Sequence, residues 1–113
     1  MDIPFLDPSI ERLPPDQTAI LNLHAEPYPD GIRVRVNLEL TPFIHPPCIE
    51  LLINDPNGNE AGSASIVEPM GWKIDLTLHI RPSALNTGVF TLSALLTYPD
   101  IGVIDQVKTK FQI

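Results

Sequence analysis

Residues 32–40 and 72–80 each alternate strictly between apolar and polar side chains. A period of two residues places one kind of side chain on each face of a β-strand, and it excludes a helix. Both segments are therefore predicted to be strands whose apolar side chains point inwards. Those side chains are Ile32, Val34, Val36, Leu38 and Leu40 in the first segment, and Trp72, Ile74, Leu76, Leu78 and Ile80 in the second.

Four further segments show the same period in a weaker or shorter form and predict strands over 17–26, 48–54, 89–98 and 103–113, and a fifth strand is predicted over 60–67. The segment 60–67 is small and polar, which suits an edge strand with little to bury. In the other four, the side chains expected to point inwards are Ala19, Leu21, Leu23 and Ala25; Ile49, Leu51 and Ile53; Phe90, Leu92, Ala94, Leu96 and Tyr98; and Val107, Thr109, Phe111 and Ile113.

The segments between these strands have turn chemistry. Tyr28-Pro29-Asp30-Gly31 reads as a turn, and Asp55–Asn59 reads as a tight type I reversal with Asn or Gly at a positive φ. The first sixteen residues carry four prolines and no regular period. We therefore expect an irregular leader over 1–16 and, over 17–113, one all-β domain: a seven-stranded antiparallel β-sandwich.

Composition narrows the class of protein. A chain of 113 residues that is 43% hydrophobic suits one globular domain. Fourteen acidic residues face seven basic ones, which disfavours binding to nucleic acid. Cys48 is the only cysteine, so no internal disulfide forms. Because the start lacks the features of a signal peptide and no apolar run approaches the roughly 20 residues of a membrane span, we expect a cytoplasmic protein without membrane contact.

The run Gly88-Val89-Phe90-Thr91-Leu92-Ser93-Ala94, which follows the crossover Ile80-Arg81-Pro82, resembles the sixth strand of immunoglobulin-like and fibronectin type III-like domains. The overall plan is similar to small uncharacterised bacterial proteins of that fold. The resemblance implies the sandwich fold and no activity. It departs from the family at Phe90, where such domains often carry a tyrosine that hydrogen-bonds to the crossover.

Candidate chemistry along the chain is sparse. His45 and Cys48 are separated by prolines and lack the further ligands of a metal site or the orienting group of a nucleophilic pair. Asp55–Glu60 has some oxygens of a calcium loop, but turn chemistry alone explains its residues. The serines have no Gly-x-Ser-x-Gly context. We therefore expect no catalytic centre, no metal and no cofactor.

The outward positions of the predicted strands divide into two kinds. One sheet should carry a charged face, and the other a face with almost no charge apart from Glu50, Lys108 and Lys110. The expected charged residues are Arg33, Arg35, Lys73, His79 and Arg81. The expected uncharged residues are Leu52, Val89, Thr91, Ser93, Leu95 and Thr97. The charged residues suit a solvated surface with cross-strand ion pairs, or else a site for an anion or acidic partner.

The uncharged residues suggest association, because large exposed patches without charge often mark contact surfaces. We expect a non-catalytic interaction or assembly module that binds a protein partner, or forms a homodimer, through this face or through edge strand 60–67. Leu95→Asp should then convert a dimer to a monomer. One alternative is that the leader covers the face. Another is a small-ligand or carbohydrate-binding accessory domain with Trp72, Tyr28 and Tyr98 as stacking groups.

Overall fold

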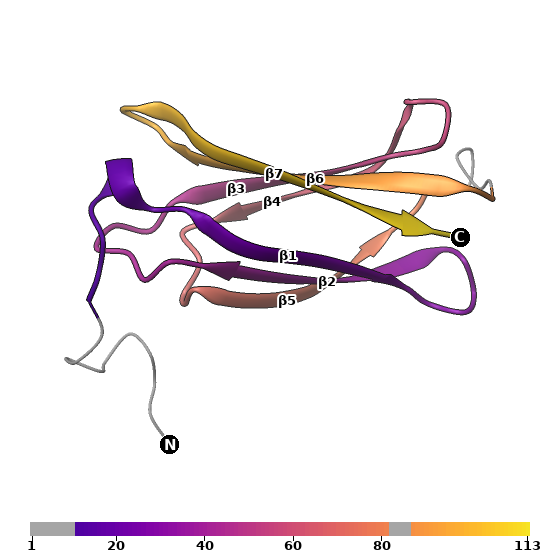
Figure 1. Cartoon of the computed structure of the whole chain (residues 1–113), viewed down its shortest axis with the longest axis horizontal. Helices are drawn as coiled ribbons and strands as arrows, with labels where there is room; N and C mark the ends of the chain where they lie inside the picture. The colour runs from indigo at the N-terminus through magenta and orange to yellow at the C-terminus, as the bar shows by residue number, and fades with distance from the viewer. Residues whose placement is uncertain (1–10, 82–86) are drawn as a thin grey trace, which may run out of the picture.

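The computed structural model describes residues 11–81 and 87–113, and it shows two antiparallel β-sheets packed face to face (Figure 1). The prediction of a seven-stranded sandwich is confirmed. A short 3₁₀ helix, η2 (Pro15–Gln17), precedes the first strand. The strands are β1 (Ile20–Pro27), β2 (Arg33–Leu40), β3 (Cys48–Asn54), β4 (Glu60–Val67), β5 (Lys73–His79), β6 (Val89–Tyr98) and β7 (Gly102–Gln112).

The three-stranded sheet has the order β1-β2-β5, and the four-stranded sheet has the order β4-β3-β6-β7. Three pairs of consecutive strands are neighbours in the same sheet: β1 and β2, β3 and β4, and β6 and β7. The three connections between these pairs and β5 cross from one sheet to the other (Figure 1). Segment 60–67 is an edge strand, as its small side chains indicate.

The core lies between the sheets and consists mainly of aliphatic side chains. Along β2, β3 and β6, buried inward residues alternate with more exposed outward ones, as the sequence period predicts. Phe43 packs edge-on against Trp72 at 6.2 Å, and Phe90 stacks on Phe111 at 5.6 Å between ring centroids. Each fully buried aliphatic or aromatic side chain stabilises the fold by about 1.5–3 kcal/mol relative to exposure.

Two side chains expected in the core are exposed instead. The register of β1 against β2 shifts between Ile20 and Asn22, so a bulge turns Ile20 inwards and leaves Leu21 59% exposed. Ile32 precedes β2, in the turn where Asp30 accepts its backbone N–H, and it is 41% exposed. The period alone shows neither the bulge nor the true start of the strand.

The β3/β4 turn has the chemistry that the sequence predicts. Asp55 Oδ1 accepts the backbone N–H groups of Asn57 and Asn59, each at 2.9 Å. Gly58 has the expected positive φ of 86°, which a residue with a side chain adopts only at a cost. The carboxylate of Asp55 is therefore committed to the turn.

A tyrosine does tie the sixth strand to a crossover, although Phe90 lies in the core. Tyr98, at the opposite end of β6, donates its hydroxyl to the His45 carbonyl at 2.7 Å and to Thr18 Oγ1 at 3.2 Å. Burial raises the pKa of the Tyr98 phenol, with the Thr18 hydrogen bond acting in the opposite direction. The neutral phenol thus holds the end of β6 against the 41–47 crossover.

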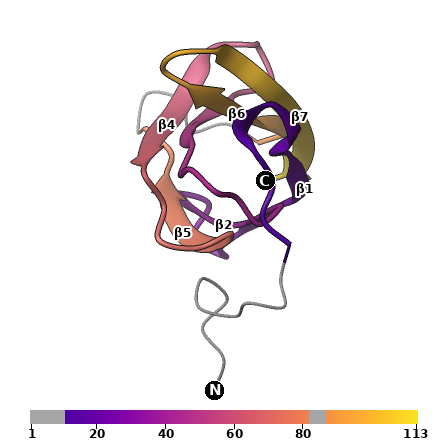
Figure 2. The ribbon, with the colours of Figure 1, turned by 90° about the vertical axis from the view of Figure 1, so that its left-hand side faces the viewer.

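The two long sides of the sandwich are closed to different extents (Figure 2). On one side β1 lies against β7, and Asp105 Oδ2 accepts the Ile20 backbone N–H at 2.9 Å. On the other side β4 and β5 meet at one corner, where the Arg81 N–H donates to the Ala61 carbonyl at 2.8 Å. Gly62 permits this approach, since a Cβ there would lie 2.8 Å from the His79 carbonyl oxygen.

The described part of the leader lies at the end of the sandwich where β3 begins. Leu13 pairs with Phe43 through hydrogen bonds to Pro42 and Ile44. The expected contribution of residues 1–10 lies outside the described residues. The described chain holds no helix with the length and hydropathy needed to cross a bilayer.

Candidate functional site

The six residues expected to form an uncharged surface do lie together. Leu52 of β3 is directly opposite Ser93 of β6, and the alternate positions of β6 continue the same face. We call this surface the uncharged face; it consists of Leu52, Val89, Thr91, Ser93, Leu95 and Thr97. All are half-buried by neighbouring strands except Val89, which is 47% exposed.

Three charged side chains lie in or beside the uncharged face, two of them on β7 and one, Glu50, on inner strand β3. Lys108 and Lys110 of β7 lie opposite Ser93 and Thr91. Glu50 of β3 lies opposite Leu95 and accepts a hydrogen bond from Ser65 Oγ at 2.5 Å. The two lysines form no salt bridge with a described residue. They are therefore available to a carboxylate on another molecule.

Apolar side chains extend the uncharged face towards the η2 end of the sandwich. Val67 of β4 and Val103 of β7 flank Cys48 and Thr97 in register, and they are 69% and 60% exposed. Burial of this surface would remove apolar area and hydroxyl groups from water, with few charges to desolvate. Depletion of charge at the centre is what distinguishes the core of a protein interface from other surface.

The opposite surface, on the three-stranded sheet, is charged as expected. Arg35 and Asp75 form a bidentate pair, with Nη2–Oδ2 at 2.6 Å and Nε–Oδ1 at 3.2 Å. Arg33 donates to Asp30 at 2.7 Å and lies over the Tyr28 ring at 4.5 Å. The hydrogen bond from Arg35 holds the pKa of Asp75 below its ordinary value of 3.8.

Arg81 and His79 complete the charged residues that the sequence singles out. Arg81 reaches the other sheet, where its guanidinium pairs with Glu60 of β4 at 2.7 Å. His79 lies opposite Arg33, and Lys73 lies opposite Glu39. The three arginines of this surface already have carboxylate partners, so an anion would have to compete with those carboxylates.

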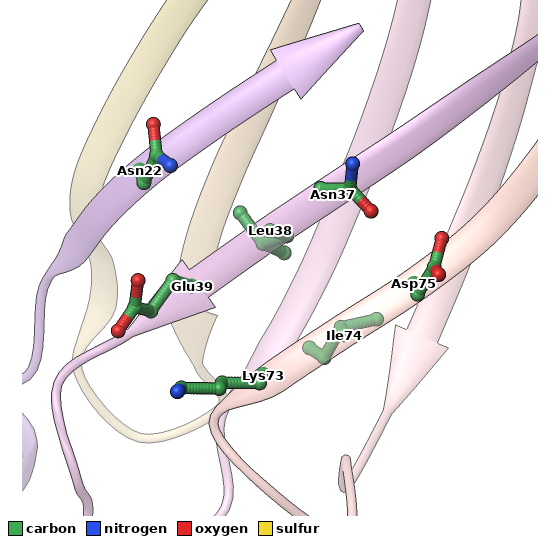
Figure 3. Close-up of a pocket in the computed structure, with 7 residues that line it drawn as sticks. All are labelled: Asn22, Asn37, Leu38, Glu39, Lys73, Ile74 and Asp75. Atoms are coloured by element: carbon green, nitrogen blue, oxygen red, sulfur yellow. The ribbon is translucent and has the colours of Figure 1, made fainter. Parts of the chain in front are cut away.

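A shallow depression of about 260 Å³ lies on the charged surface (Figure 3). Its polar side chains come from three neighbouring strands: Asn22 of β1, Asn37 and Glu39 of β2, and Lys73 and Asp75 of β5. Such a set offers both donors and acceptors to a small polar ligand. The alternation over 17–26 already turns Asn22 outwards, between Leu21 and Leu23, but it does not show that β1 lies beside β2 and so brings Asn22 to this depression.

Two of the three aromatic residues considered for ligand stacking are buried in the core. Trp72 is 5% exposed and packs on Phe43, and Tyr98 is 6% exposed with its hydroxyl bonded. Tyr28 is half-buried, and the guanidinium of Arg33 covers it. Trp72 and Tyr98 are therefore core residues, and Tyr28 alone of the three remains at the surface.

His45 and Cys48 lie on the crossover and at the start of β3. His45 is exposed, and its carbonyl accepts the Tyr98 hydroxyl. Among residues 11–81 and 87–113, no three His, Cys, Asp or Glu side chains gather as metal ligands would.

No family model and no curated protein matches the chain. Solved structures do resemble it. A glycosyl hydrolase family 2 member from Bacteroides cellulosilyticus matches with a TM-score of 0.64 at 15% identity, over 85% of this chain and 14% of that one. The Bifidobacterium dentium β-glucuronidase, complexed with coumarin-3-O-glucuronide, matches with a TM-score of 0.62 at 18% identity, over 88% and 18%.

The Ruminococcus gnavus β-glucuronidase, in complex with C6-substituted uronic isofagomine, gives a TM-score of 0.58 at 15% identity, over 86% of this chain and 16% of that one. The chain thus spans about one sixth of the length of these enzymes, as a β-sandwich domain within each. At such low identity the likeness shows the fold alone.

Proposed function

We propose that the protein is a non-catalytic assembly module that binds a protein partner through the uncharged face. The observation that carries this proposal is the contrast in charge between the two outer surfaces. Arginines of the charged surface are paired within the chain, whereas Lys108 and Lys110 beside the uncharged face have no salt-bridge partner among the described residues.

The chemistry of the surface defines the partner. Leu52 and Leu95 offer apolar area near the centre, and the hydroxyls of β6 accept and donate hydrogen bonds there. Lys108 and Lys110 favour a partner with carboxylates at the matching edge, which would steer the encounter. The likeness to sandwich domains inside larger enzymes supports an accessory role, since those domains are small parts of long chains.

The test compares one charge at the centre of each surface. Leu95→Asp should abolish retention of a partner from native cells, because an unpaired carboxylate would be buried at the contact. Thr77→Asp, at an exposed outward position of β5, should retain it. With the purified partner, we expect Leu95→Asp to weaken binding by at least about tenfold. Equal binding by both variants, or no partner for the wild-type chain, would contradict the proposal.

The depression on the charged surface supports a second candidate, binding of a small polar ligand such as a saccharide. Its five polar side chains supply the hydrogen bonds, and Tyr28, in the turn after β1, is the aromatic residue of the three that remains at the surface for stacking. A glycan screen should then give a hit that Lys73→Ala weakens. A screen without hits would remove this candidate and leave the protein-binding proposal standing.

A further inference from the structure

The outer edge of β4 has no backbone partner among the described residues from Ser63 to Val67. β4 is the last strand of its sheet, and from Ser63 to Val67 its described backbone partners all lie on β3. An edge of this kind presents free N–H and C=O groups to a second strand. Proteins usually protect such edges with charges, prolines, bulges or a covering segment.

The other sheet edges do have protection. β1 and β7 cover one another, with the Ile20–Asp105 hydrogen bond between them. β7 also carries Lys108 and Lys110, and β5 carries Lys73 and Asp75 at exposed positions. Protection of these edges makes β4 the place where a further strand could pair.

The stretch from Ser63 to Val67, by contrast, reads Ser-Ala-Ser-Ile-Val, without charge, proline or glycine. Its pairing with β3 is regular, because the bulge opposite Ile53 and Asn54 comes before it. The side chains of Ser63, Ser65 and Val67 are exposed. Ile66 and Val67 are β-branched, a type that favours strand pairing.

When two copies meet, one ion pair between them is available at each end of β4, on an arginine that also pairs with Glu60. An antiparallel pair related by a two-fold axis brings the end of one strand beside the start of the other. Glu68 is exposed just after β4, and Arg81 stands beside its start with 52% of its side chain exposed. Arg81 of each copy would therefore lie within reach of Glu68 of the second copy, in addition to its own Glu60.

We propose that the protein forms a two-fold dimer in which β4 pairs antiparallel with β4 of a second copy. The two four-stranded sheets then form one continuous sheet, and exposed Val67 and Met70 gain cover at the junction. This arrangement extends the proposed function, because it sets two uncharged faces side by side. It depends on the backbone edge of β4 and not on the six residues of the uncharged face, so the two proposals can fail separately.

Two serines provide a matched test on the full chain. Ser63 and Ser93 both lie opposite Leu52, one on edge strand β4 and the other on central strand β6. In sedimentation and light scattering, the mass of the wild type should rise with concentration towards twice 12.5 kDa. Ser63→Lys should raise the dimer dissociation constant by at least about tenfold, whereas Ser93→Lys should change it by less than about twofold.

The outcomes separate edge pairing from packing through the face. Loss of the dimer in Ser63→Lys alone supports edge pairing. A wild type that stays monomeric at every concentration overturns edge pairing and leaves the partner proposal untouched. Loss in Ser93→Lys, alone or together with Ser63→Lys, assigns self-association to the uncharged face instead, and a dimer unaffected by either variant also contradicts edge pairing. Should Ser63→Lys fail to fold by circular dichroism, Ser65→Lys, at an exposed position of the same edge, replaces it.

Discussion

The outer surfaces of the two sheets are built on the same alternation but use it differently. On the three-stranded sheet, outward positions hold Arg33, Arg35 and Asp75, and their charges are balanced by ion pairs within the chain. On the four-stranded sheet, the outward positions of β6 hold hydroxyl and apolar side chains, with Lys108 and Lys110 beside them. The arginines of the first surface are paired within the chain, although Lys73 and Glu39 form no salt bridge there with a described residue; the second surface leaves both apolar area and charge for another molecule.

This difference follows from which neighbour each outward side chain has across the strands. Directly opposite and diagonal positions lie close enough for long side chains to meet. Arg35 reaches Asp75 on the diagonal, since its direct partner in the register is Thr77. The direct partner of Lys108 is Ser93, and the carboxylate of Glu50 lies on β3, which is separated from β7 by β6. Register therefore sets which charges can meet, although Lys73 and Glu39 lie directly opposite each other without a salt bridge.

Our largest predicted effect tests which side of β6 faces the core. Leu95 and Leu96 are neighbours in sequence, but Leu96 is fully buried and Leu95 lies on the uncharged face. Leu96→Ala should reduce the free energy of unfolding by about 2–5 kcal/mol, because it leaves a cavity. Leu95→Ala should cost about 1 kcal/mol or less, since only part of its surface is buried.

Denaturant unfolding of both variants measures these costs. Equal losses of stability in the two would mean that Leu95 is as well packed as Leu96. The uncharged face would then already be covered by the chain itself, and the contrast between the two surfaces would disappear.

Much of this fold can be predicted from the sequence because strand period and turn chemistry are local. The alternation over 89–98 places Phe90 and Leu96 inside, and the structure agrees. Asp55 and Gly58 specify their turn in the same local way. Leu21 is the instructive failure, because a bulge depends on pairing with β2 and leaves no mark in the period.

The site is less predictable than the fold, since it depends on which strands become neighbours. The outward residues of β6 can be grouped from their period alone. The ion pair of Arg81 with Glu60 cannot, because it joins two sheets at an open corner. The role of Tyr98 is hidden for a similar reason: its partners, Thr18 and the His45 carbonyl, lie far away in sequence.

A smaller change in melting temperature should distinguish a paired charge on one surface from an unpaired charge on the other. Asp75→Asn removes the negative charge of the Arg35 pair and one of its two acceptor oxygens, and it should lower the melting temperature slightly, by much less than Leu96→Ala does. The loss should shrink as salt is added, because both partners are solvent-exposed. Lys108→Gln should leave the melting temperature unchanged. A larger loss for Lys108→Gln than for Asp75→Asn would show that the lysine is already used within the fold.

The smallest effect is the acid titration of the charged surface. Hydrogen bonds from the Ile32 backbone N–H and from the Arg33 side chain lower the pKa of Asp30, and the Arg35 pair lowers the pKa of Asp75, both from 3.8. A carboxyl group whose pKa is lower in the folded state contributes stability above its unfolded pKa. That contribution disappears as the pH falls through the folded pKa.

The stability advantage of the wild type over Asp75→Asn should therefore be constant at pH values above 3.8 and vanish in stronger acid. Thermal unfolding against pH measures it, and the NMR shift of the Asp75 carboxyl carbon gives its pKa directly. Lys108→Gln serves as the control, because it removes no carboxylate and should follow the wild-type profile. An Asp75 pKa at or above 3.8 would mean that the Arg35 pair does not persist in solution. Arg35 would then be as available to an acidic partner as Lys108 is, and the contrast between the two surfaces would no longer favour the uncharged one.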